Sequence, residues 1–366
     1  MNSVCTTQSS GTPGQRRAIE AATGTERNTS PRALGRIKRM RLGVVNRGPD
    51  LLEDVWAQRI PALVARSLEG SRVSPINAGQ MASGTPMPLI KDWLNRRPRL
   101  NFVVAGAEKA GTTAMFSYLK RVPGVHIPLP KELNFFDRPA WGDGTDFSPL
   151  HRWFVLAPTG AILGEATPTY LMNPECFPRI HEYNPDMRII AILRSPIRRA
   201  FSAWNFRRAR LRDKRDFMTA VRVEIESGGD LSVARENKYR YMSAGLYASQ
   251  IKALRETFDE EQLLLIKFEE FNRHQEDWVR RAARHIGATD GFPFEKTRRP
   301  NAWGYKHRLE KDQFEELLPY YEQDIAEVEQ LTGWDCSDWR RYEKTAGTAA
   351  EEASRASGPG ENASAG

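Results

Sequence analysis

The chain contains only three cysteines, Cys5, Cys176 and Cys336. An odd number of cysteines without a Cys-x-x-Cys pair predicts neither a zinc site nor a disulfide framework. Whether Cys176 and Cys336 pair depends on the separation of their Cα atoms, which a sequence does not give. We expect these thiols to stay reduced in a cytoplasmic protein.

Long apolar runs and internal repeats are also missing from the sequence. No segment approaches the roughly 20 apolar residues that a membrane-spanning helix requires, and no apolar core of a signal peptide is recognisable. No repeat with a solenoid period is visible either. We therefore expect a protein without a membrane span, and its hydrophobic content of 40% is sufficient for one substantial α/β domain.

Positive charge is in excess, with a formal net charge of +8 and a pI near 9.4. Part of it lies near the N-terminus, where the arginines lack the interleaved aromatic residues of a nucleic-acid-binding surface, so we expect no nucleic-acid partner. A second cluster follows a predicted helix and comprises Arg207, Arg208, Arg210, Arg212, Lys214 and Arg215. Such a cluster either steers anionic ligands toward a cleft or is simply the solvent-exposed end of a helix, and both interpretations stay open.

Composition divides the chain into four parts. Residues 1–35 are rich in small polar residues and arginine and are predicted to be a disordered basic tail. Residues 36–97 are predicted to form an extension with one or two helices and a linker. A single α/β domain is predicted for residues 98–343, and residues 344–366 are predicted to be a disordered tail.

The most informative segment runs from Phe102 to Leu119 and reads FVVAGAEKAGTTAMFSYL. It predicts a buried strand, a loop bounded by Gly106 and Gly111, and a helix that opens at two threonines. Backbone N–H groups of such a loop and of the helix N-terminus converge on one point, where an oxyanion fits. The sequence therefore predicts an anion-binding loop with Lys109 as its point charge.

The spacing of this loop is close to that of the Walker A motif, G-x-x-x-x-G-K-[ST], but does not match it. Lys109 lies two residues before the second glycine, and Thr112 occupies the lysine position of the motif. This displacement argues against a loop for ATP and magnesium. An ordinary strand-to-helix turn in a core is the alternative interpretation of the loop alone.

A second anion subsite is predicted at the end of another buried strand. Residues 189–192 are apolar, Arg194 follows them, and Pro196 suits the first turn of a helix. Ligands of open α/β sheets collect at the carboxyl ends of the strands, so we expect Arg194 near the glycine loop, and Ser202 about two turns later offers a hydroxyl. A Walker B strand would end in a magnesium-binding aspartate rather than in arginine. A structural ion pair is the alternative role for Arg194.

Two further segments contain candidate catalytic groups. Residues 131–137, KELNFFD, place Glu132 between a lysine and an aromatic pair. A neighbouring cation lowers the pKa of a carboxyl group and an apolar wall raises it, so Glu132 is a candidate general base. An exposed Lys–Glu pair is the alternative. In residues 164–170, GEATPTY, either Glu165 or Thr169 is a candidate for lining a cleft, and a purely structural segment is the alternative.

The alternation of strand and helix patterns predicts a P-loop-like, three-layer α/β/α fold with a central, mainly parallel sheet. Strands are predicted at residues 101–105, near 125, and at 161–164, 188–193 and 262–267. Helices are predicted at residues 112–121, 174–183, 196–208, 217–227, 243–258, 278–286 and 308–332.

In this order and at these spacings, the segments resemble the sulfotransferases that use 3′-phosphoadenosine 5′-phosphosulfate (PAPS). They are most similar to the branch that contains bacterial carbohydrate sulfotransferases and the heparan sulfate enzymes. The resemblance covers roughly residues 99–342 and extends to the later segments 245–268 and 333–339. It implies a sulfotransferase domain that transfers a sulfuryl group from PAPS to a hydroxyl or amine of a carbohydrate, glycolipid or related metabolite.

The resemblance also implies a role for each candidate residue. Lys109 would neutralise charge on the leaving group, and Glu132 would deprotonate the acceptor for in-line attack. The implied donor-binding residues are Lys109, Ala110, Gly111, Thr112 and Thr113 at the 5′-phosphosulfate, with Arg194 and Ser202 at the 3′-phosphate. Members of the family need no metal for transfer, so none is expected here.

Two residues are implied less directly. His126 is a second candidate base because another branch of the family uses histidine, and Arg299 lies in a segment, residues 296–300, that loosely matches a late nucleotide-binding loop. Two other classes of protein stay open as alternatives. A P-loop nucleotide-dependent kinase would share the strand, loop and helix, and a non-enzymatic polyanion-binding protein would account for the positive charge.

Overall fold

The computed structural model describes residue 94 and residues 97–129, 131–137, 146–226, 239–296 and 307–343. The two predicted tails, the predicted extension up to residue 93 and the segment that contains Arg299 lie outside these residues.

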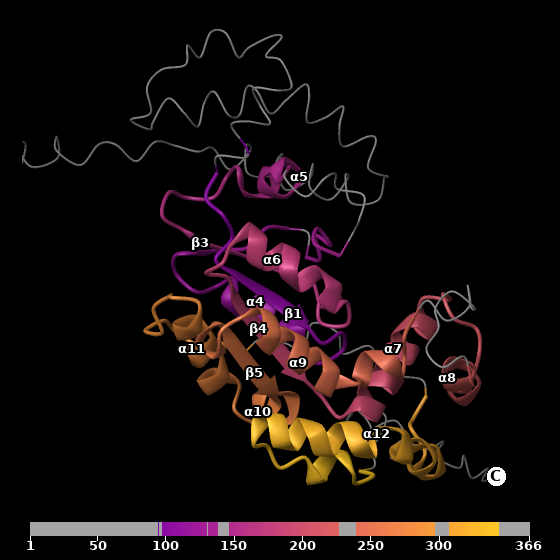
Figure 1. Cartoon of the computed structure of the whole chain (residues 1–366). Helices are drawn as coiled ribbons and strands as arrows, with labels where there is room; N and C mark the ends of the chain where they lie inside the picture. The colour runs from indigo at the N-terminus through magenta and orange to yellow at the C-terminus, as the bar shows by residue number, and fades with distance from the viewer. Residues whose placement is uncertain are drawn as a thin grey trace, which may run out of the picture. The chain divides into compact units, whose positions relative to one another are not determined.

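Five strands form one sheet in the order β2-β3-β1-β4-β5, and each pairs with its neighbours in parallel (Figure 1). They are β1 (Phe102–Gly106), β2 (Val125–His126), β3 (Ile162–Ala166), β4 (Arg188–Leu193) and β5 (Leu263–Lys267). The central strand β1 is buried along its whole length, as its unbroken apolar sequence requires for a strand covered on both faces. In register, Val103 of β1 lies between Glu165 of β3 and Ile189 of β4.

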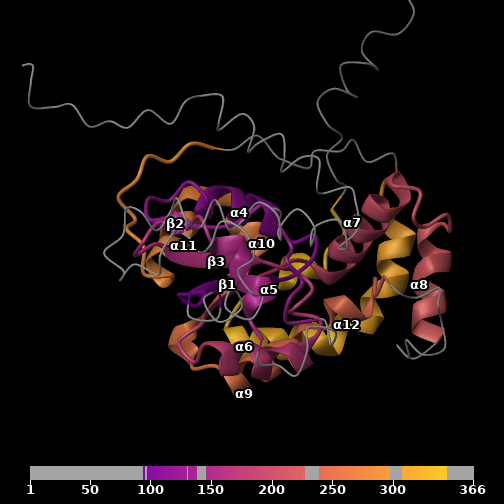
Figure 2. The same ribbon diagram turned by 90° about the horizontal axis from the view of Figure 1, so that it is seen from above.

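Helices cover both faces of this sheet, as Figure 2 shows. One face carries α4 (Thr112–Leu119), α10 (Phe268–Arg273) and α11 (Gln275–His285). The other carries α6 (Phe177–Tyr183), α9 (Tyr247–Thr257) and α12 (Lys311–Thr332). The predicted three-layer α/β/α fold with a parallel sheet is therefore confirmed, and every pair of strands in the sheet is parallel.

The remaining helices lie beside the layers. Helix α7 (Pro196–Ala209) leaves the end of β4, and α8 (Phe217–Glu226) packs on it through edge-on contact of Phe217 with Phe201, whose ring centroids are 5.0 Å apart. Helix α5 (Ser148–His151) is a single turn. Short 3-10 helices span Arg152–Phe154, Pro174–Cys176, Ser243–Gly245, Glu260–Gln262 and Ser337–Trp339.

Several boundaries and short elements differ from the sequence-based expectation. The predicted helix over residues 243–258 is broken at Leu246, because the carboxylate of Asp324 in α12 accepts hydrogen bonds from the backbone N–H groups of Tyr247 and Ala248 and so starts α9 there. Helix α11 begins at Gln275 rather than at residue 278. Helices α5 and α10 were not predicted, since six or fewer residues carry too little periodicity to be recognised.

Two absences can be stated for the described part of the chain. Cys176 and Cys336 are both buried and unpaired there, which answers the question that their spacing left open. None of the helices described has the length and apolarity needed to cross a bilayer.

Candidate active site

The predicted anion-binding loop connects β1 to α4. Its first amide, that of Ala107, donates to the carbonyl of Ile192 in β4 (2.8 Å), and the amide of Ala110 closes a turn on the carbonyl of Ala107 (3.1 Å). Gly111 precedes α4 with a φ of 97°, in the left-handed region that favours glycine. The N–H groups of Thr112 and Thr113, the first two residues of α4, have no acceptor within the helix.

The loop backbone leaves no room for side chains at its two glycines. A Cβ atom at Gly106 would lie 2.4 Å from Leu171, and one at Gly111 would lie 3.1 Å from the ring of Phe268. Thr112 is buried and Thr113 is half-buried. A loop with a glycine at each end, followed by two threonines at a helix N-terminus, suits an oxyanion such as a phosphate or sulfate.

Arg194 lies next to this loop, as predicted from its position at the end of β4. Its Nη1 donates to the backbone carbonyl of Lys109 at 3.1 Å. Its guanidinium also stacks on the ring of Phe268, 4.8 Å from the centroid. Phe268 therefore supports both the glycine turn and the arginine, and the carboxyl ends of β1 and β4 form one two-part site.

The side chain of Lys109 lies among other cations. Its Nζ is 4.1 Å from the ring centroid of Phe206 in α7, and Arg210 approaches the same ring at 3.7 Å. The pKa of Lys109 is lowered to about 8, mainly by burial and also by the positive charges of Arg194, Arg210 and Arg207, while Glu108 opposes the shift. An anion bound in the loop would offset this repulsion and hold the lysine in its charged form.

Glu108 and Arg207 form an ion pair beside Lys109, with 2.8 Å between Arg207 Nη2 and Glu108 Oε1. Both side chains are largely buried, so this pair attaches α7 to the loop more firmly than an exposed pair would. Part of the basic cluster after the predicted helix is thus used within the protein. Ser202 is buried in the same helix, and its role in ligand binding stays a prediction.

Glu132 lies on a segment that is fixed to the sheet. Its backbone N–H donates to the carbonyl of Ala166 at the end of β3 (3.1 Å), and its φ of 70° turns the chain sharply. The carboxylate forms an ion pair with Lys131 and keeps 50% of its side chain exposed. The predicted Lys–Glu pair is therefore present, and its exposed carboxylate is also free to meet a second substrate.

A buried group of hydroxyls orders the backbone beyond Glu132. Thr167 Oγ1 accepts a hydrogen bond from the N–H of Asn134 (3.2 Å) and donates to Glu165 Oε2 (2.8 Å). The hydroxyl of Tyr170 accepts hydrogen bonds from the N–H groups of Phe135 (3.0 Å) and Phe136 (3.3 Å). Glu165 is 1% exposed, so it does not line an open cleft. Its function in the structure is to anchor the segment that carries Glu132.

The alternative base, His126, lies on β2 at the edge of the sheet, separated from β1 by β3. It is half-buried and meets the ring of Phe154 edge-on, with 6.2 Å between centroids. Arg299 falls outside the described residues. In the parts of the chain that the structure describes, no cluster of three or more histidine, cysteine, aspartate or glutamate side chains is arranged to hold a metal ion.

Two aromatic residues of this site were not identified from the sequence. Phe206 and Phe268 contact the side chains of Lys109 and Arg194, and each belongs to a different helix. An aromatic residue directly after an apolar strand, as in LLLIKF, is a signal for Phe268, because the residue after a parallel strand lies at the ligand-binding edge. Phe206 has no such signal, since aromatic residues within helices are mostly core.

The structure is that of an α/β protein in which the cationic residues Lys109 and Arg194 lie together at the carboxyl ends of two neighbouring parallel strands. Residues 100–300 match the family described as the Sulfotransferase domain. A crystal structure of a sulfotransferase from Alicyclobacillus acidocaldarius is similar, with 31% identity, a TM-score of 0.59, and coverage of 67% of this chain and 100% of that chain. The chain belongs to the sulfotransferase family, which confirms the resemblance found in the sequence.

Two curated relatives share shorter segments. The membrane-associated sulfotransferase kil1 of Dictyostelium discoideum is 31% identical over 107 residues, which are 29% of this chain and 22% of that protein. Heparan sulfate glucosamine 3-O-sulfotransferase 6 of Mus musculus is 34% identical over 105 residues, 27% of this chain and 28% of that protein. The matches thus span less than a third of the length of either relative.

The buried Glu165 predicts a specific dependence of stability on pH. Burial raises its pKa from 4.5 to about 7, opposed by hydrogen bonds from Tyr170 and Thr167 and assisted by the nearby charge of Asp137. The folded state therefore binds the proton more tightly, and this stabilisation is present below pH 4.5 and is lost as the pH rises through 7. Glu165→Gln removes the effect.

We expect the free energy of unfolding of the wild type to fall, relative to that of Glu165→Gln, by roughly 1–3 kcal/mol between pH 5 and pH 8. Urea unfolding at the two pH values measures this difference. Glu175→Gln, at an exposed position, is the matched control and should leave the pH dependence unchanged. Parallel pH dependences of Glu165→Gln and the wild type would contradict the assignment.

Proposed function

We propose that this sulfotransferase uses PAPS as its donor and transfers the sulfuryl group to a hydroxyl or amine of a carbohydrate, glycolipid or related metabolite. The observation that carries the proposal is the hydrogen bond of 3.1 Å between Arg194 Nη1 and the carbonyl of Lys109. It joins two cationic strand ends into one site with two anion subsites. PAPS has an anionic group at each end of its ribose and matches such a site.

In this proposal the donor lies across the ends of β1 and β4. The first-turn amides and threonines of α4 hold the 5′-phosphosulfate, and Arg194 meets the 3′-phosphate with its planar guanidinium. Stacking on Phe268 limits the freedom of that guanidinium before the ligand arrives. Gly106 and Gly111 support this placement, because they let the loop pack closely on Leu171 and Phe268 and so hold the start of α4 in position.

Lys109 acts on the leaving group. As the bond between sulfur and the bridging oxygen breaks, negative charge develops on the phosphate, and an ammonium group beside it lowers the barrier. Glu132 accepts the proton of the acceptor as the acceptor oxygen or nitrogen attacks sulfur in line. The exposure of its carboxylate supports this role, because an acceptor from solution has to reach it.

The acceptor class rests on the relatives. One of them is named for glucosamine of heparan sulfate, and we extend a carbohydrate-like acceptor to this chain on that basis. The cations around Phe206, which are the half-buried Lys109 and the exposed Arg210, support an acceptor that carries negative charge or many hydroxyl groups.

The donor is tested by thermal and urea stability in the presence of three ligands. Adenosine 3′,5′-bisphosphate at about 100 times its Kd should increase the free energy of unfolding by about 2.7 kcal/mol. ATP with magnesium and a single-stranded oligonucleotide at the same concentration should have smaller effects. A clear shift with ATP and magnesium, and none with the bisphosphate, would favour a kinase; a shift with the oligonucleotide alone would favour a polyanion-binding protein.

Lys109 should determine the alkaline limit of activity. Its pKa of about 8 in the free protein means that the ammonium form is lost above that pH. We expect kcat/KM for PAPS to fall above pH 8, and the fall to move to higher pH in Lys109→Arg, whose guanidinium stays charged. Lys109→Ala should lower kcat by roughly 10²- to 10³-fold. A wild-type profile that Lys109→Arg leaves unchanged would assign the titration to another group.

Glu132 should separate donor binding from transfer. We expect Glu132→Gln to bind adenosine 3′,5′-bisphosphate within a few-fold of the wild type and to lose roughly 10²- to 10⁴-fold in kcat, because the amide cannot accept the acceptor proton. Calorimetry and a sulfate-transfer assay measure the two quantities. Glu182→Gln, an exposed change on α6, is the control. Loss of bisphosphate binding in Glu132→Gln would show that the base lies elsewhere.

A further inference from the structure

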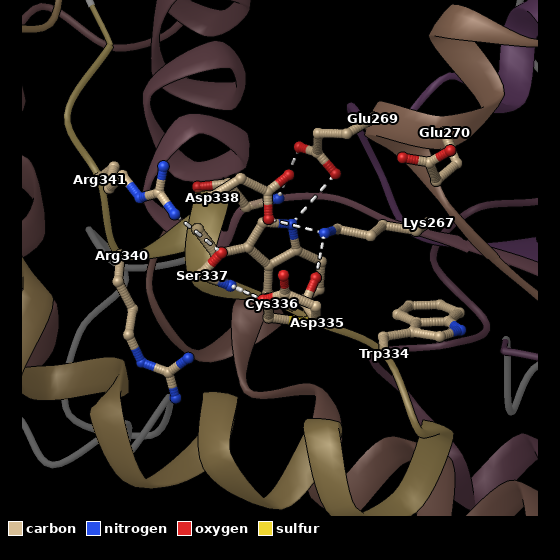
Figure 3. Close-up of polar contacts among 12 residues, drawn as sticks. Lys267, Glu269, Glu270, Trp334, Asp335, Cys336, Ser337, Asp338, Arg340 and Arg341 are labelled. Carbon is tan, nitrogen blue, oxygen red and sulfur yellow. Dashed lines mark hydrogen bonds and ion pairs between the residues drawn. The ribbon is translucent and has the colours of Figure 1, made fainter.

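The segment that follows α12 returns to the donor-binding edge of the sheet. We call residues 333–343 the C-terminal strap. Trp339 of the strap is fully buried, although the strap itself contains only one turn of 3-10 helix. Figure 3 shows the strap residues Asp335 and Asp338 gathered around the side chains of Lys267 and Glu269, which lie where β5 passes into α10.

Glu269 connects the strap to the residue after Arg194. Its Oε1 accepts a hydrogen bond from the backbone N–H of Ser195 (3.2 Å), and its Oε2 accepts one from the indole N–H of Trp339 (3.0 Å). Ser195 is fully buried and precedes the first residue of α7, so its N–H has no acceptor within that helix. One carboxylate therefore fixes both the turn after β4 and the strap.

Lys267 holds the strap in place beside Glu269. This lysine is 8% exposed, and its Nζ donates to the carbonyl of Asp335 (2.5 Å) and to the carboxylate of Asp338 (2.6 Å). Arg198 of α7 adds hydrogen bonds to the carbonyls of Asp338 (3.4 Å) and Arg341 (2.8 Å). The strap is thus attached to β5, the neighbour of β4 in the sheet, and to α7, the helix that follows the Arg194 turn.

The peptide group between Arg194 and Ser195 is fixed at both its carbonyl and its N–H. The carbonyl accepts the hydroxyl hydrogen bond of Tyr247 (3.0 Å), and the N–H is held by Glu269. The ring under the Arg194 guanidinium belongs to Phe268, the neighbour of Glu269 in sequence. A change at Glu269 would therefore alter the turn and the stacking surface together.

We propose that Glu269 is a positioning residue for Arg194 and that Trp339, by orienting Glu269, makes the C-terminal strap part of the 3′-phosphate subsite. This inference rests on the proposed function, in which Arg194 meets the 3′-phosphate. The strap acts without touching the ligand. Its effect is larger at the 3′ end of the donor, because the loop around Lys109, although it contacts Arg194, is also held by contacts with β4 and with Arg207 that do not involve Glu269.

The test compares two nucleotides in the full-length chain. Adenosine 3′,5′-bisphosphate carries the 3′-phosphate and adenosine 5′-phosphate does not. The Kd of the 5′-phosphate divided by the Kd of the bisphosphate therefore reports the 3′-subsite alone. We expect Trp339→Phe, which removes the indole N–H, and Glu269→Gln, which removes the charge, to reduce this ratio by about 10-fold, the scale of one hydrogen bond to a charged group. Binding of adenosine 5′-phosphate should stay within about three-fold of the wild type.

Two controls separate positioning from loss of stability. Trp334→Phe makes the same substitution elsewhere on the strap, at a half-buried indole, and should preserve the ratio. In an Arg194→Ala background, Glu269→Gln should cause no further loss, because its effect passes through Arg194. A purely structural role would instead lower both affinities, and would do so with or without Arg194.

The outcomes distinguish failure of the proposed donor from failure of the positioning role of Glu269. If the wild type binds adenosine 3′,5′-bisphosphate no tighter than adenosine 5′-phosphate, the proposed donor and this inference both fail. If the wild type prefers the bisphosphate and folded Glu269→Gln and Trp339→Phe keep that preference, the positioning role of Glu269 and the strap is wrong while the donor stands. Should Trp339→Phe not fold, the near-isosteric Glu269→Gln decides the question.

Discussion

The hydrogen bond between the Arg194 guanidinium and the Lys109 carbonyl is the interaction on which the site depends. It requires β1 and β4 to be neighbours with parallel directions, since only then do the loop after β1 and the turn after β4 meet at one edge. The central place of β1 in the sheet follows from its fully apolar sequence. A buried strand of this kind needs helices on both faces, and one of them, α10, supplies the Phe268 ring under Arg194, whereas the Phe206 ring beside Lys109 comes from α7.

Much of the fold could be predicted from the sequence because its signals are local. Strand β4 was predicted at the residues where it occurs, since an apolar run ended by Arg194 and Pro196 has sharp limits. The start of α9 could not be predicted in the same way. It depends on Asp324, which lies on another helix, so the sequence of residues 243–246 does not indicate where α9 begins. A helix end that is capped by a side chain far away in the sequence cannot be predicted from the residues around that end.

The candidate site shows the same division. Lys109, Gly111 and Arg194 were identified because each has a fixed place relative to a strand end. Phe206, Glu269 and Trp339 were not identified as parts of the site, since their contacts with it come from tertiary packing alone. Glu165 was predicted as a candidate for a cleft and lies buried instead, because its neighbours Thr167 and Tyr170 offer it hydrogen bonds inside the protein.

The contacts that shape the site join residues that are far apart along the chain. Arg194 and Lys109 are separated by 85 residues, Glu269 and Trp339 by 70, and Arg207 and Glu108 by 99. Closing such long loops costs chain entropy before the contact contributes anything, so these contacts form late in folding. A partly folded chain can contain most of the helices and still lack the site. Formation of these contacts is consequently a measure of complete folding, and a more demanding one than helix content.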